Sequence, residues 1–328
     1  MRSDGCKQSR SGCVLGMLVA LGLWGLILPD PLRAERIIAG MSSIGLYEFP
    51  TEVAREKGFY AEEGLELVKV SMRTDLVTKA LLAGDLDYSF MWGSTLRAAV
   101  AGMPVRGVMG MYGKPLHMLV GRPGLKRVED LKGKKIAVSA FGSTPDVLLR
   151  ATLRHFGLNP EKDVQILSVG GSGIRLAALA AGSVDATPLD LAYVGKSERM
   201  GLSTIIYLGD VLNLPLSGVG TSDKKIRENP DQIRRLARAT LKAMQFIREK
   251  RKEAIRLMVD YLKLTGEDAD RIYDFSLRSL SPDGHFSEES LLTDISQARQ
   301  ALKIEKEVPL SQVVDWSFIG RARPRHNP

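Results

Sequence analysis

The chain has 328 residues, is 44% apolar, carries a formal net charge of +8 at pH 7 and contains two cysteines. This composition is typical of a folded globular protein long enough for two domains, and it excludes global disorder. The positive surplus lies largely in helical stretches between residues 234 and 252, where acidic residues are interleaved. That pattern favours a solvated helix face over a nucleic-acid surface.

Residues 1–34 are predicted to form a secretory signal peptide. A basic start leads into an apolar run over residues 14–28 and a turn-rich exit that ends at Ala34. The run is shorter than the roughly 20 residues of a membrane-spanning helix, so cleavage after Ala34 is favoured, with an uncleaved anchor as the alternative. Cys6 and Cys13 precede the run, so the mature chain would lack cysteine. This excludes a disulfide scaffold, a thiolate metal site and a cysteine nucleophile. We expect a periplasmic protein.

Beyond the leader, strand and helix patterns alternate. Strands are predicted at residues 36–41, 65–70, 87–92 and 105–111, and the helical patterns between them end at Gly58, Gly84 and Gly102. A glycine at this position is the usual end of a helix. Alternation of this kind predicts parallel βαβ units, because parallel neighbours need a crossover connection.

The pattern occurs twice. The helix–glycine–strand segment at residues 79–87 is repeated at residues 177–185, and the flanking strands and glycines recur in the same order. Two copies are too few for a solenoid. The sequence therefore predicts two similar α/β lobes, and a cleft between such lobes is a usual place for a small ligand.

The second copy and the C-terminal region complete the predicted order. Residues 113–117 and 207–218 are predicted to contain the two crossings between lobes, which enclose strands at 118–120, 136–138, 164–169 and 185–188. Helices follow from residues 230, 253, 266, 288 and 311. Asn229, Thr265 and Ser287 are the predicted N-caps of the helices that start at residues 230, 266 and 288. The apolar stripes of these helices predict core packing.

Several loops bring small and hydroxyl residues to the ends of predicted strands. Residues 93–95, 142–144 and 170–173 each stand at a helix N-terminus, where free N–H groups and the helix dipole favour an anion. Simple helix capping is the alternative for each loop. Since duplicated sheets carry these loops at equivalent ends, we favour a shared ligand site. The glycine spacing matches neither a Walker A nor a dinucleotide motif.

Other side chains could complete such a site. Arg73 and Arg175 stand near the starts of the duplicated helices and could bind an anionic group, with a surface salt bridge as the alternative. Trp92, Tyr47 and Phe49 could form an aromatic wall or pack in the core. Asp190 could accept from a ligand amine or cap a helix. His117 is interpreted as a structural hydrogen-bonding residue. The candidate ligand-binding residues are Gly45, Tyr47, Arg73, Trp92, Gly93, Ser94, Thr95, Gly142, Ser143, Thr144, Ser172, Arg175 and Asp190.

Four strings together resemble a known family. They are the Gly58-Phe59-Tyr60-x-x-Glu63-Gly64-Leu65 segment after Ala54, residues 83–87, residues 102–105 and residues 131–138. In their order and spacing they resemble the ABC-transporter solute-binding proteins of the nitrate, sulfonate, taurine and thiamine-pyrimidine-precursor group, over about residues 36 to 320. The resemblance implies an α/β, two-lobed type II periplasmic-binding-protein fold. In that fold two parallel-core sheets are flanked by helices and joined by a two-stranded hinge.

The resemblance also implies domain limits and a function. Lobe one would comprise residues 35–115 and 217–328, and lobe two residues 116–216. The protein would be a monomeric receptor, without enzymatic activity or cofactor, that closes on a small anionic or heteroaromatic solute and delivers it to an ABC permease and its ATPase. No nucleic acid or metal is expected. The alternative is an enzyme on the same fold, such as a pyrimidine-precursor synthase or a menaquinone-pathway enzyme. The sequence does not identify the solute.

Overall fold

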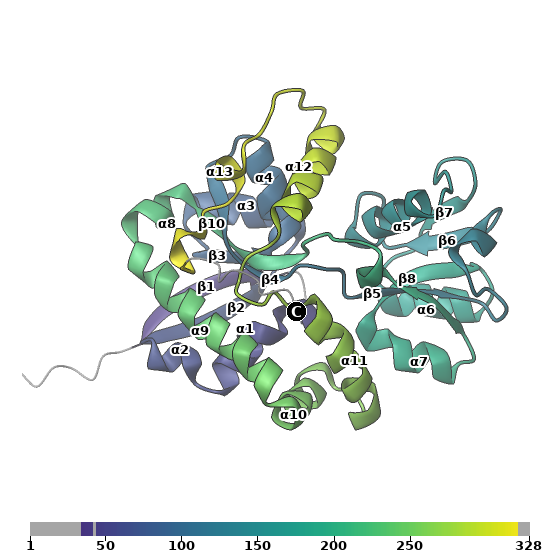
Figure 1. The fold of residues 1–328 in the computed structure, drawn as a ribbon, viewed down its shortest axis with the longest axis horizontal. Helices are drawn as coiled ribbons and strands as arrows, with labels where there is room; N and C mark the ends of the chain where they lie inside the picture. Colours follow the sequence, from purple (N-terminus) through teal and green to yellow (C-terminus); the bar gives the residue numbers. More distant parts are fainter. Residues whose placement is uncertain (1–33, 42–43, 321–328) are drawn as a thin grey trace, which may run out of the picture. The chain divides into compact units, whose positions relative to one another are not determined.

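The computed structural model describes residues 34–41 and 44–320 (Figure 1). The predicted signal peptide, apart from Ala34, lies outside the described residues. In the described part of the chain, none of the helices has both the length and the hydropathy needed to cross a bilayer.

Two five-stranded sheets form the framework. In spatial order the first contains β2 (Leu65–Ser71), β1 (Glu35–Met41), β3 (Tyr88–Met91), β10 (Ser217–Ser222) and β4 (Val105–Tyr112). The second contains β7 (Gln165–Ser168), β6 (Lys135–Val138), β8 (Ala186–Asp190), β5 (His117–Gly121) and β9 (Ser203–Tyr207). In each sheet three neighbouring strands are parallel, and an antiparallel strand follows them. The predicted pair of parallel-core sheets is confirmed.

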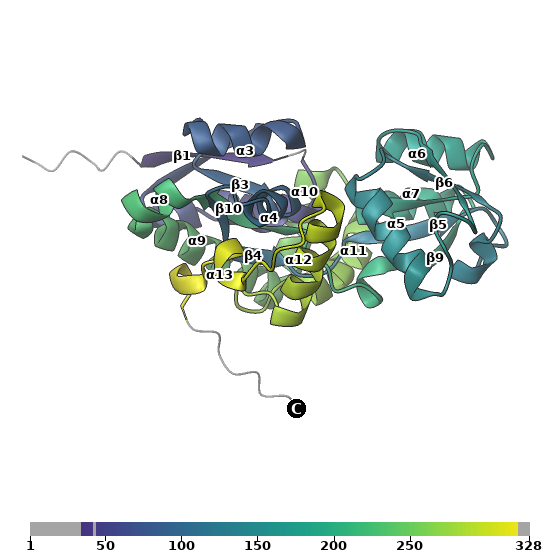
Figure 2. The same ribbon diagram turned by 90° about the horizontal axis from the view of Figure 1, so that it is seen from above.

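Helices cover both faces of the first sheet. Figure 2 shows α3 along one face, with α9 on the opposite side. Ile37 and Ala39 of β1 pack with the cluster that contains α1 and α9, whereas Ile38 packs with the cluster of α3 and α4. This alternation follows from the two-residue period of a strand. The helices around this sheet are α1 (Phe49–Glu56), α2 (Phe59–Glu62), α3 (Thr74–Ala83), α4 (Trp92–Val100), α8 (Asp223–Glu228), α9 (Pro230–Glu249), α10 (Arg251–Leu262), α12 (Glu288–Leu302) and α13 (Leu310–Val313).

The second sheet repeats this arrangement on a smaller scale. Leu176 and Leu179 of α6 (Ser172–Ala180) pack on one face, and Leu148 and Leu149 of α5 (Thr144–His155) belong to the cluster on the other. α7 (Val194–Arg199) also belongs to this part of the chain, whereas α11 (Gly266–Ser279) follows α10 and packs against it. The chain enters this sheet between Tyr112 and His117 and leaves it between Tyr207 and Ser217. The domain limits given above remain a prediction.

Local signals explain most helix boundaries. Gly84 follows α3 with φ 84° and Gly157 follows α5 with φ 77°, as expected of glycines that end helices. The Thr265 and Ser287 hydroxyls accept from the amides of Asp268 and Ser290, at 3.1 and 3.2 Å, which confirms both predicted N-caps. Before α5 the N-cap is Ser143.

Buried glycines of the first sheet make room for an indole ring. A Cβ added to Gly107 would lie 2.4 and 2.6 Å from ring atoms of Trp92. We expect Gly107→Ala to lower the free energy of unfolding by about 1–3 kcal/mol, the usual effect of overpacking a core. Urea denaturation measures this change.

The matched control for that substitution is Gly266→Ala at the start of α11, where an added Cβ meets nothing within 4 Å. Alanine there should leave stability unchanged or raise it slightly. Equal effects at Gly107 and Gly266 would contradict the packing argument.

Candidate functional site

The carboxyl ends of three parallel strands lie at one edge of the second sheet. β6 pairs in parallel with both β7 and β8, so the loops after these strands are neighbours. The Ser168 hydroxyl, at the end of β7, donates to the carbonyl of Ser139 after β6 at 3.3 Å. Loops at the carboxyl ends of strands are where open α/β sheets hold ligands.

A chain of polar contacts connects this edge to the first sheet. Tyr47, in the 3-10 helix Leu46–Glu48 after β1, has its hydroxyl 3.1 Å from Nδ1 of His117. Nε2 of His117 lies 3.4 Å from Oδ1 of Asp190, and Oδ2 of Asp190 accepts from the Ser172 hydroxyl. Three of the predicted site residues, Tyr47, Ser172 and Asp190, are thereby connected.

The hydrogen bonds of Tyr47 assign the tautomer of His117. The Tyr47 hydroxyl accepts from the backbone N–H of Leu116 at 2.9 Å, so its own proton is free to be donated to Nδ1. The neutral ring then carries its proton on Nε2, facing Asp190. Burial lowers the pKa of His117, which favours this neutral form. The interpretation of His117 as a structural hydrogen-bonding residue agrees with these contacts.

Arg175 is almost fully buried, with 1% exposure, and four of its five N–H donors are used within the protein. Nε donates to the Thr187 hydroxyl at 3.0 Å, and Nη1 to the carbonyl of Gly170 at 2.6 Å. Nη2 donates to the Ser172 hydroxyl and to the carbonyl of Pro188, both at 3.0 Å. The guanidinium therefore holds the loop before α6 against β8.

A buried carboxyl group that the sequence did not single out lies beside this chain of contacts. Glu48 follows Tyr47 directly and is 5% exposed. Burial raises the pKa of Glu48 to about 8; Lys69 opposes that rise and Asp190 adds to it. Within the described residues, no other residue hydrogen-bonds to this carboxyl. Glu48 lies within a short amphipathic segment, and that sequence pattern did not indicate a role for its carboxyl group.

The loop after β6 contains three further candidates. The amide of Gly142, which has φ 75°, donates to Oδ2 of Asp146 at 2.8 Å. The Ser143 hydroxyl donates to the carbonyl of Ala140 at 2.6 Å and accepts from the Ser139 hydroxyl at 2.8 Å. Thr144 is exposed at the first position of α5. These contacts are the local capping that the sequence left open as the alternative.

The candidates of the first sheet are divided between its edge and its core. Gly45 precedes the 3-10 helix, and Arg73 is exposed at the N-cap of α3. Trp92 starts α4, is 1% exposed, donates to Asp294 at 3.2 Å and stacks on Trp316. Its ring therefore packs in the core, which was the alternative to an aromatic wall. Gly93, Ser94 and Thr95 follow it on the same helix, and the Thr95 side chain is buried under β10.

The Ser94 hydroxyl is buried and has no hydrogen-bond partner among the described residues. An unpaired buried polar group costs about 1–3 kcal/mol. We therefore expect Ser94→Ala to keep or raise the free energy of unfolding, by up to about 1 kcal/mol. Differential scanning calorimetry measures the change, and a clear loss of stability would show that the hydroxyl has a partner. Thr51→Ala is the control, because that hydroxyl donates to the carbonyl of Glu48 at 2.7 Å.

Three exposed apolar side chains stand at the strand ends. Ile44 is 65% exposed, Phe141 64% and Ile174 61%. They lie in the loop after β1, in the loop after β6 and at the start of α6. Single exposed apolar residues are common on protein surfaces, and a contiguous patch of them marks a ligand or partner site. In the sequence, the position of Phe141 directly before Gly142 of the candidate loop could have indicated an apolar side chain at this strand end.

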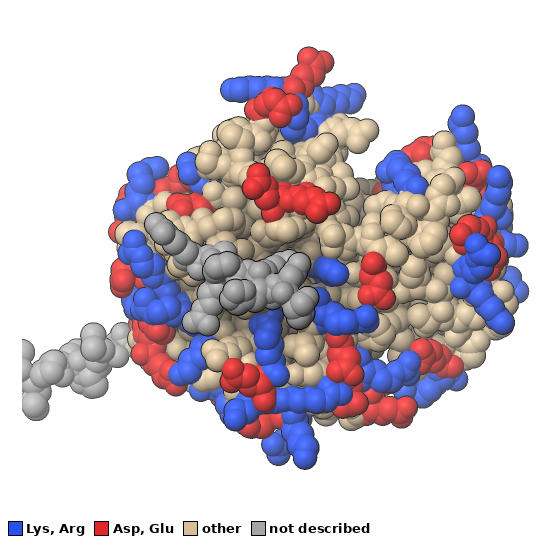
Figure 3. All heavy atoms as spheres, viewed as in Figure 1, with Lys and Arg blue, Asp and Glu red and all other residues tan. Residues whose placement is uncertain are grey.

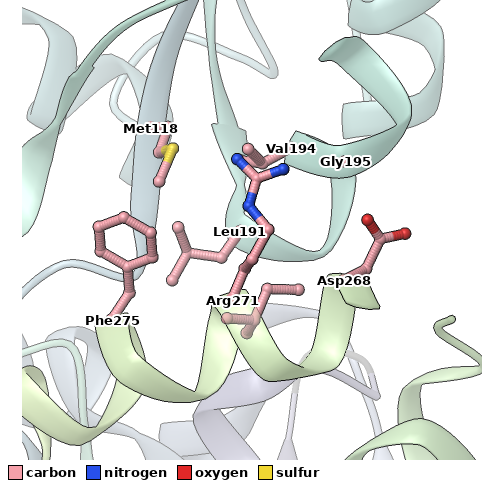
Figure 4. Close-up of a pocket in the computed structure, with 8 residues that line it drawn as sticks. Met118, Leu191, Val194, Gly195, Asp268, Arg271 and Phe275 are labelled. Atoms are coloured by element: carbon pink, nitrogen blue, oxygen red, sulfur yellow. The ribbon is translucent and has the colours of Figure 1, made fainter. Parts of the chain in front are cut away.

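A small cavity occurs elsewhere, between α11 and the second sheet (Figure 4). Its volume of about 240 Å³ includes space open to solvent, and Met118, Leu191 and Phe275 form apolar walls. Asp268 and Arg271 at its rim are paired with Arg199 and Glu198, at 2.8 and 2.9 Å. The cavity therefore offers a ligand few free polar groups. In the described part of the chain, no cluster of His, Cys, Asp and Glu could hold a metal ion.

Solved structures of other proteins share this fold. The periplasmic aliphatic sulphonate binding protein SsuA of Escherichia coli matches with a TM-score of 0.70 at 19% identity, covering 87% of this chain and 98% of SsuA. The desulfurization enzyme DszB matches with a TM-score of 0.66 at 18% identity, covering 87% and 97%. At these identities the likeness shows the fold alone. The fold is that of the periplasmic solute-binding proteins, as the sequence predicted.

The chain belongs to the NMT1/THI5 like family, whose model matches residues 47–254. The riboflavin-binding protein RibY of Chloroflexus aurantiacus is 28% identical over 283 residues, which cover 82% of this chain and 71% of RibY. The family match includes Tyr47, Glu48, His117, Arg175 and Asp190.

Proposed function

We propose that this protein is an extracytoplasmic receptor of an ABC importer. It binds a small solute between two lobes, of which the first comprises residues 35–115 and 217–328 and the second residues 116–216. The observation that carries the proposal is the polar chain from Tyr47 to Asp190, which joins the loop after β1 to the carboxyl edge of the second sheet. A solute bound at such a junction contacts both parts and favours a closed form. The fold and the binding-protein relatives support this function.

Export to the periplasm belongs to the same proposal. It is supported by the apolar run over residues 14–28 and the small residue Ala34 that follows it. Cell fractionation combined with N-terminal mass spectrometry tests it, and a chain that begins at residue 35 in the periplasm is expected. The full-length chain in the cytoplasm would contradict the proposal.

A thermal-shift screen tests solute binding. Sulfonates, nitrate, aromatic carboxylates, pyrimidines and flavins are the classes to compare, because a solute that binds only the folded state raises its melting temperature. With a solute found, small-angle scattering should show a smaller radius of gyration in the complex. A rigid envelope with bound solute would contradict closure.

An enzyme on this fold is the second candidate, favoured by the fold match to DszB. The two functions differ in the fate of the bound molecule. A receptor releases its solute unchanged, whereas an enzyme converts it. Mass spectrometry of the solute recovered after prolonged incubation distinguishes them, and a changed mass would favour the enzyme.

A further inference from the structure

We propose that α7 and α11 form a latch between the two predicted lobes. Ion pairs between these helices hold the lobes in the arrangement in which the Tyr47 hydroxyl reaches His117. The inference goes beyond the proposed function, because it concerns the balance between lobe arrangements and not the solute. None of the candidate ligand-binding residues lies on α7 or α11.

The contacts of α11 cross the predicted limit between the lobes. α11 belongs to residues 217–328 of the first lobe, whereas α7 and β9 lie within residues 116–216 of the second. The backbone connects the two predicted lobes at residues 115–116 and 216–217. α11 therefore adds a non-covalent connection to these two covalent ones.

Two bidentate ion pairs join α11 to α7. Nη1 and Nη2 of Arg199 donate to Oδ1 and Oδ2 of Asp268, at 3.0 and 2.8 Å. Arg271 donates to both carboxylate oxygens of Glu198, at 2.9 Å to Oε1. Bidentate pairs of this kind are stronger and more directional than single contacts. Each helix contributes one arginine and one carboxylate, so sliding of one helix along the other would bring like charges together.

Gly195 of α7 makes room for the Asp268 carboxylate (Figure 4). A Cβ added to Gly195 would lie 1.7 Å from Oδ1 and 2.4 Å from Cγ of Asp268. Asp268 is 6% exposed, and its amide donates to the Thr265 hydroxyl at the start of α11. The carboxylate is thus held at a fixed place between the two helices.

The other end of α11 contacts β9 and the segment that follows it. The hydroxyls of Tyr207 and Ser279 are 2.5 Å apart, and the ring centroids of Tyr207 and Phe275 are 4.7 Å apart. Arg278 donates to Asp210 at 3.2 Å. Contacts with the second lobe therefore occur from residue 268 to residue 279.

This connection is of a kind that can open. The apolar packing beneath the ion pairs leaves the cavity that Met118, Leu191 and Phe275 line. A contact of surface pairs around a cavity separates more readily than a close-packed core. One exposed ion pair shifts an equilibrium by up to about fivefold, so several pairs together are enough to bias two lobe arrangements without fixing either.

The latch has a consequence for the receptor. In the latched arrangement the Tyr47 hydroxyl lies 3.1 Å from Nδ1 of His117. The ion pairs between α7 and α11 therefore raise the fraction of solute-free molecules in which the loop after β1 contacts the second sheet. A solute that contacts both lobes shifts only the remaining molecules, which raises its apparent affinity.

Pulsed electron paramagnetic resonance tests the latch in the protein without solute. Cys6→Ser and Cys13→Ser remove both cysteines of the chain. Leu82→Cys and Val147→Cys then place one nitroxide label on α3 and one on α5, at positions that are 43% and 37% exposed. One main distance between the labels is expected when the latch is intact.

Two variants open the latch by different means. Arg271→Glu places a second carboxylate against Glu198, and the population outside the main distance should rise about fivefold. Gly195→Ala keeps every charge but displaces Asp268 from Arg199, so it should act in the same direction. Arg271→Glu combined with Glu198→Arg restores opposite charges and should restore the main distance.

Arg238→Glu is the matched control. Arg238 is 53% exposed and makes a bidentate pair with Glu63, at 3.0 and 2.6 Å, within the first lobe. The same change of charge should leave the distance distribution as it was. Circular dichroism confirms folding of every variant, and Gly195→Ala keeps the test valid if a charge variant fails to fold.

Three results would overturn the latch. They are an unchanged distribution in both Arg271→Glu and Gly195→Ala, an equal change in Arg238→Glu, and a charge exchange between Arg271 and Glu198 that fails to restore the main distance. Because these measurements use no solute, each of these results leaves the receptor function to be judged by the thermal-shift screen.

Discussion

Replacing Arg175 with alanine is expected to lower the free energy of unfolding by about 3–5 kcal/mol, the range measured when one member of a buried charged network is removed. The guanidinium is 1% exposed and makes four hydrogen bonds. Without it the carbonyls of Gly170 and Pro188 lose these donors, and a cavity opens between α6 and β8. Urea denaturation followed by circular dichroism measures the loss.

Two further variants make this test specific. Arg175→Lys keeps the charge but cannot reproduce a planar set of four hydrogen bonds. Its free energy of unfolding should therefore lie between that of the alanine variant and that of the unchanged protein. Arg127→Ala is the control, because that side chain is 72% exposed and pairs with Glu129 on the surface. Similar losses at Arg175 and Arg127 would contradict the structural role of Arg175.

Glu48 should make stability fall as pH rises. Its folded-state pKa of about 8 lies above the value of 4.5 of a solvent-exposed glutamate, so between these values the unfolded chain releases a proton that the folded chain retains. Stability is therefore complete below about pH 4.5 and is lost as pH rises through about 8. This difference in pKa corresponds to roughly 5 kcal/mol at about 1.4 kcal/mol per pH unit.

Comparison of Glu48→Gln with the unchanged protein isolates this contribution. The two proteins should have similar stability at pH 4, and the variant should be more stable by several kcal/mol at pH 9. Asp294, whose pKa burial raises to about 7, acts in the same direction, and His117 acts in the opposite direction. Asp294 and His117 are present in both proteins, so their contributions largely cancel in the stability difference between the two. A stability difference that does not change with pH would contradict the burial of Glu48.

The repeated module could be predicted from the sequence because its signals are local. Apolar runs of strand length, helical spacing and terminal glycines each depend on a few neighbouring residues. β1 extends from Glu35 to Met41, close to the predicted 36–41. Trp92 was placed at the end of a strand but starts α4, since both patterns tolerate an aromatic residue at that boundary.

The burial and contacts of the candidate site side chains depend on partners far away in the sequence, which local sequence patterns do not reveal. Trp92 meets Phe286 and Trp316, which come from the C-terminal region of the chain. The sequence allows Arg175 to be exposed or buried on its helix, and its burial depends on four acceptors, among them the carbonyls of Gly170 and Pro188. The role of Glu48 became visible only from its burial.

The charge distribution was easier to predict. Figure 3 shows Lys and Arg intermingled with Asp and Glu on the displayed face, which fits the expected solvated helix surface. Pairs such as Arg238 with Glu63 and Lys242 with Glu62 link α9 to the segment around α2. Exposed pairs of this kind contribute little to stability each.

The stacked indoles of Trp92 and Trp316, with ring planes 8° apart, also determine what fluorescence can report. The chain has three tryptophans, and the third, Trp24, lies outside the described residues. Tryptophan emission from the described part therefore comes from the first sheet and its helices, and this emission does not report directly on melting of the second sheet. Superimposable fluorescence and circular dichroism transitions would mean that the two halves melt cooperatively, whereas separate midpoints would mean that they melt independently.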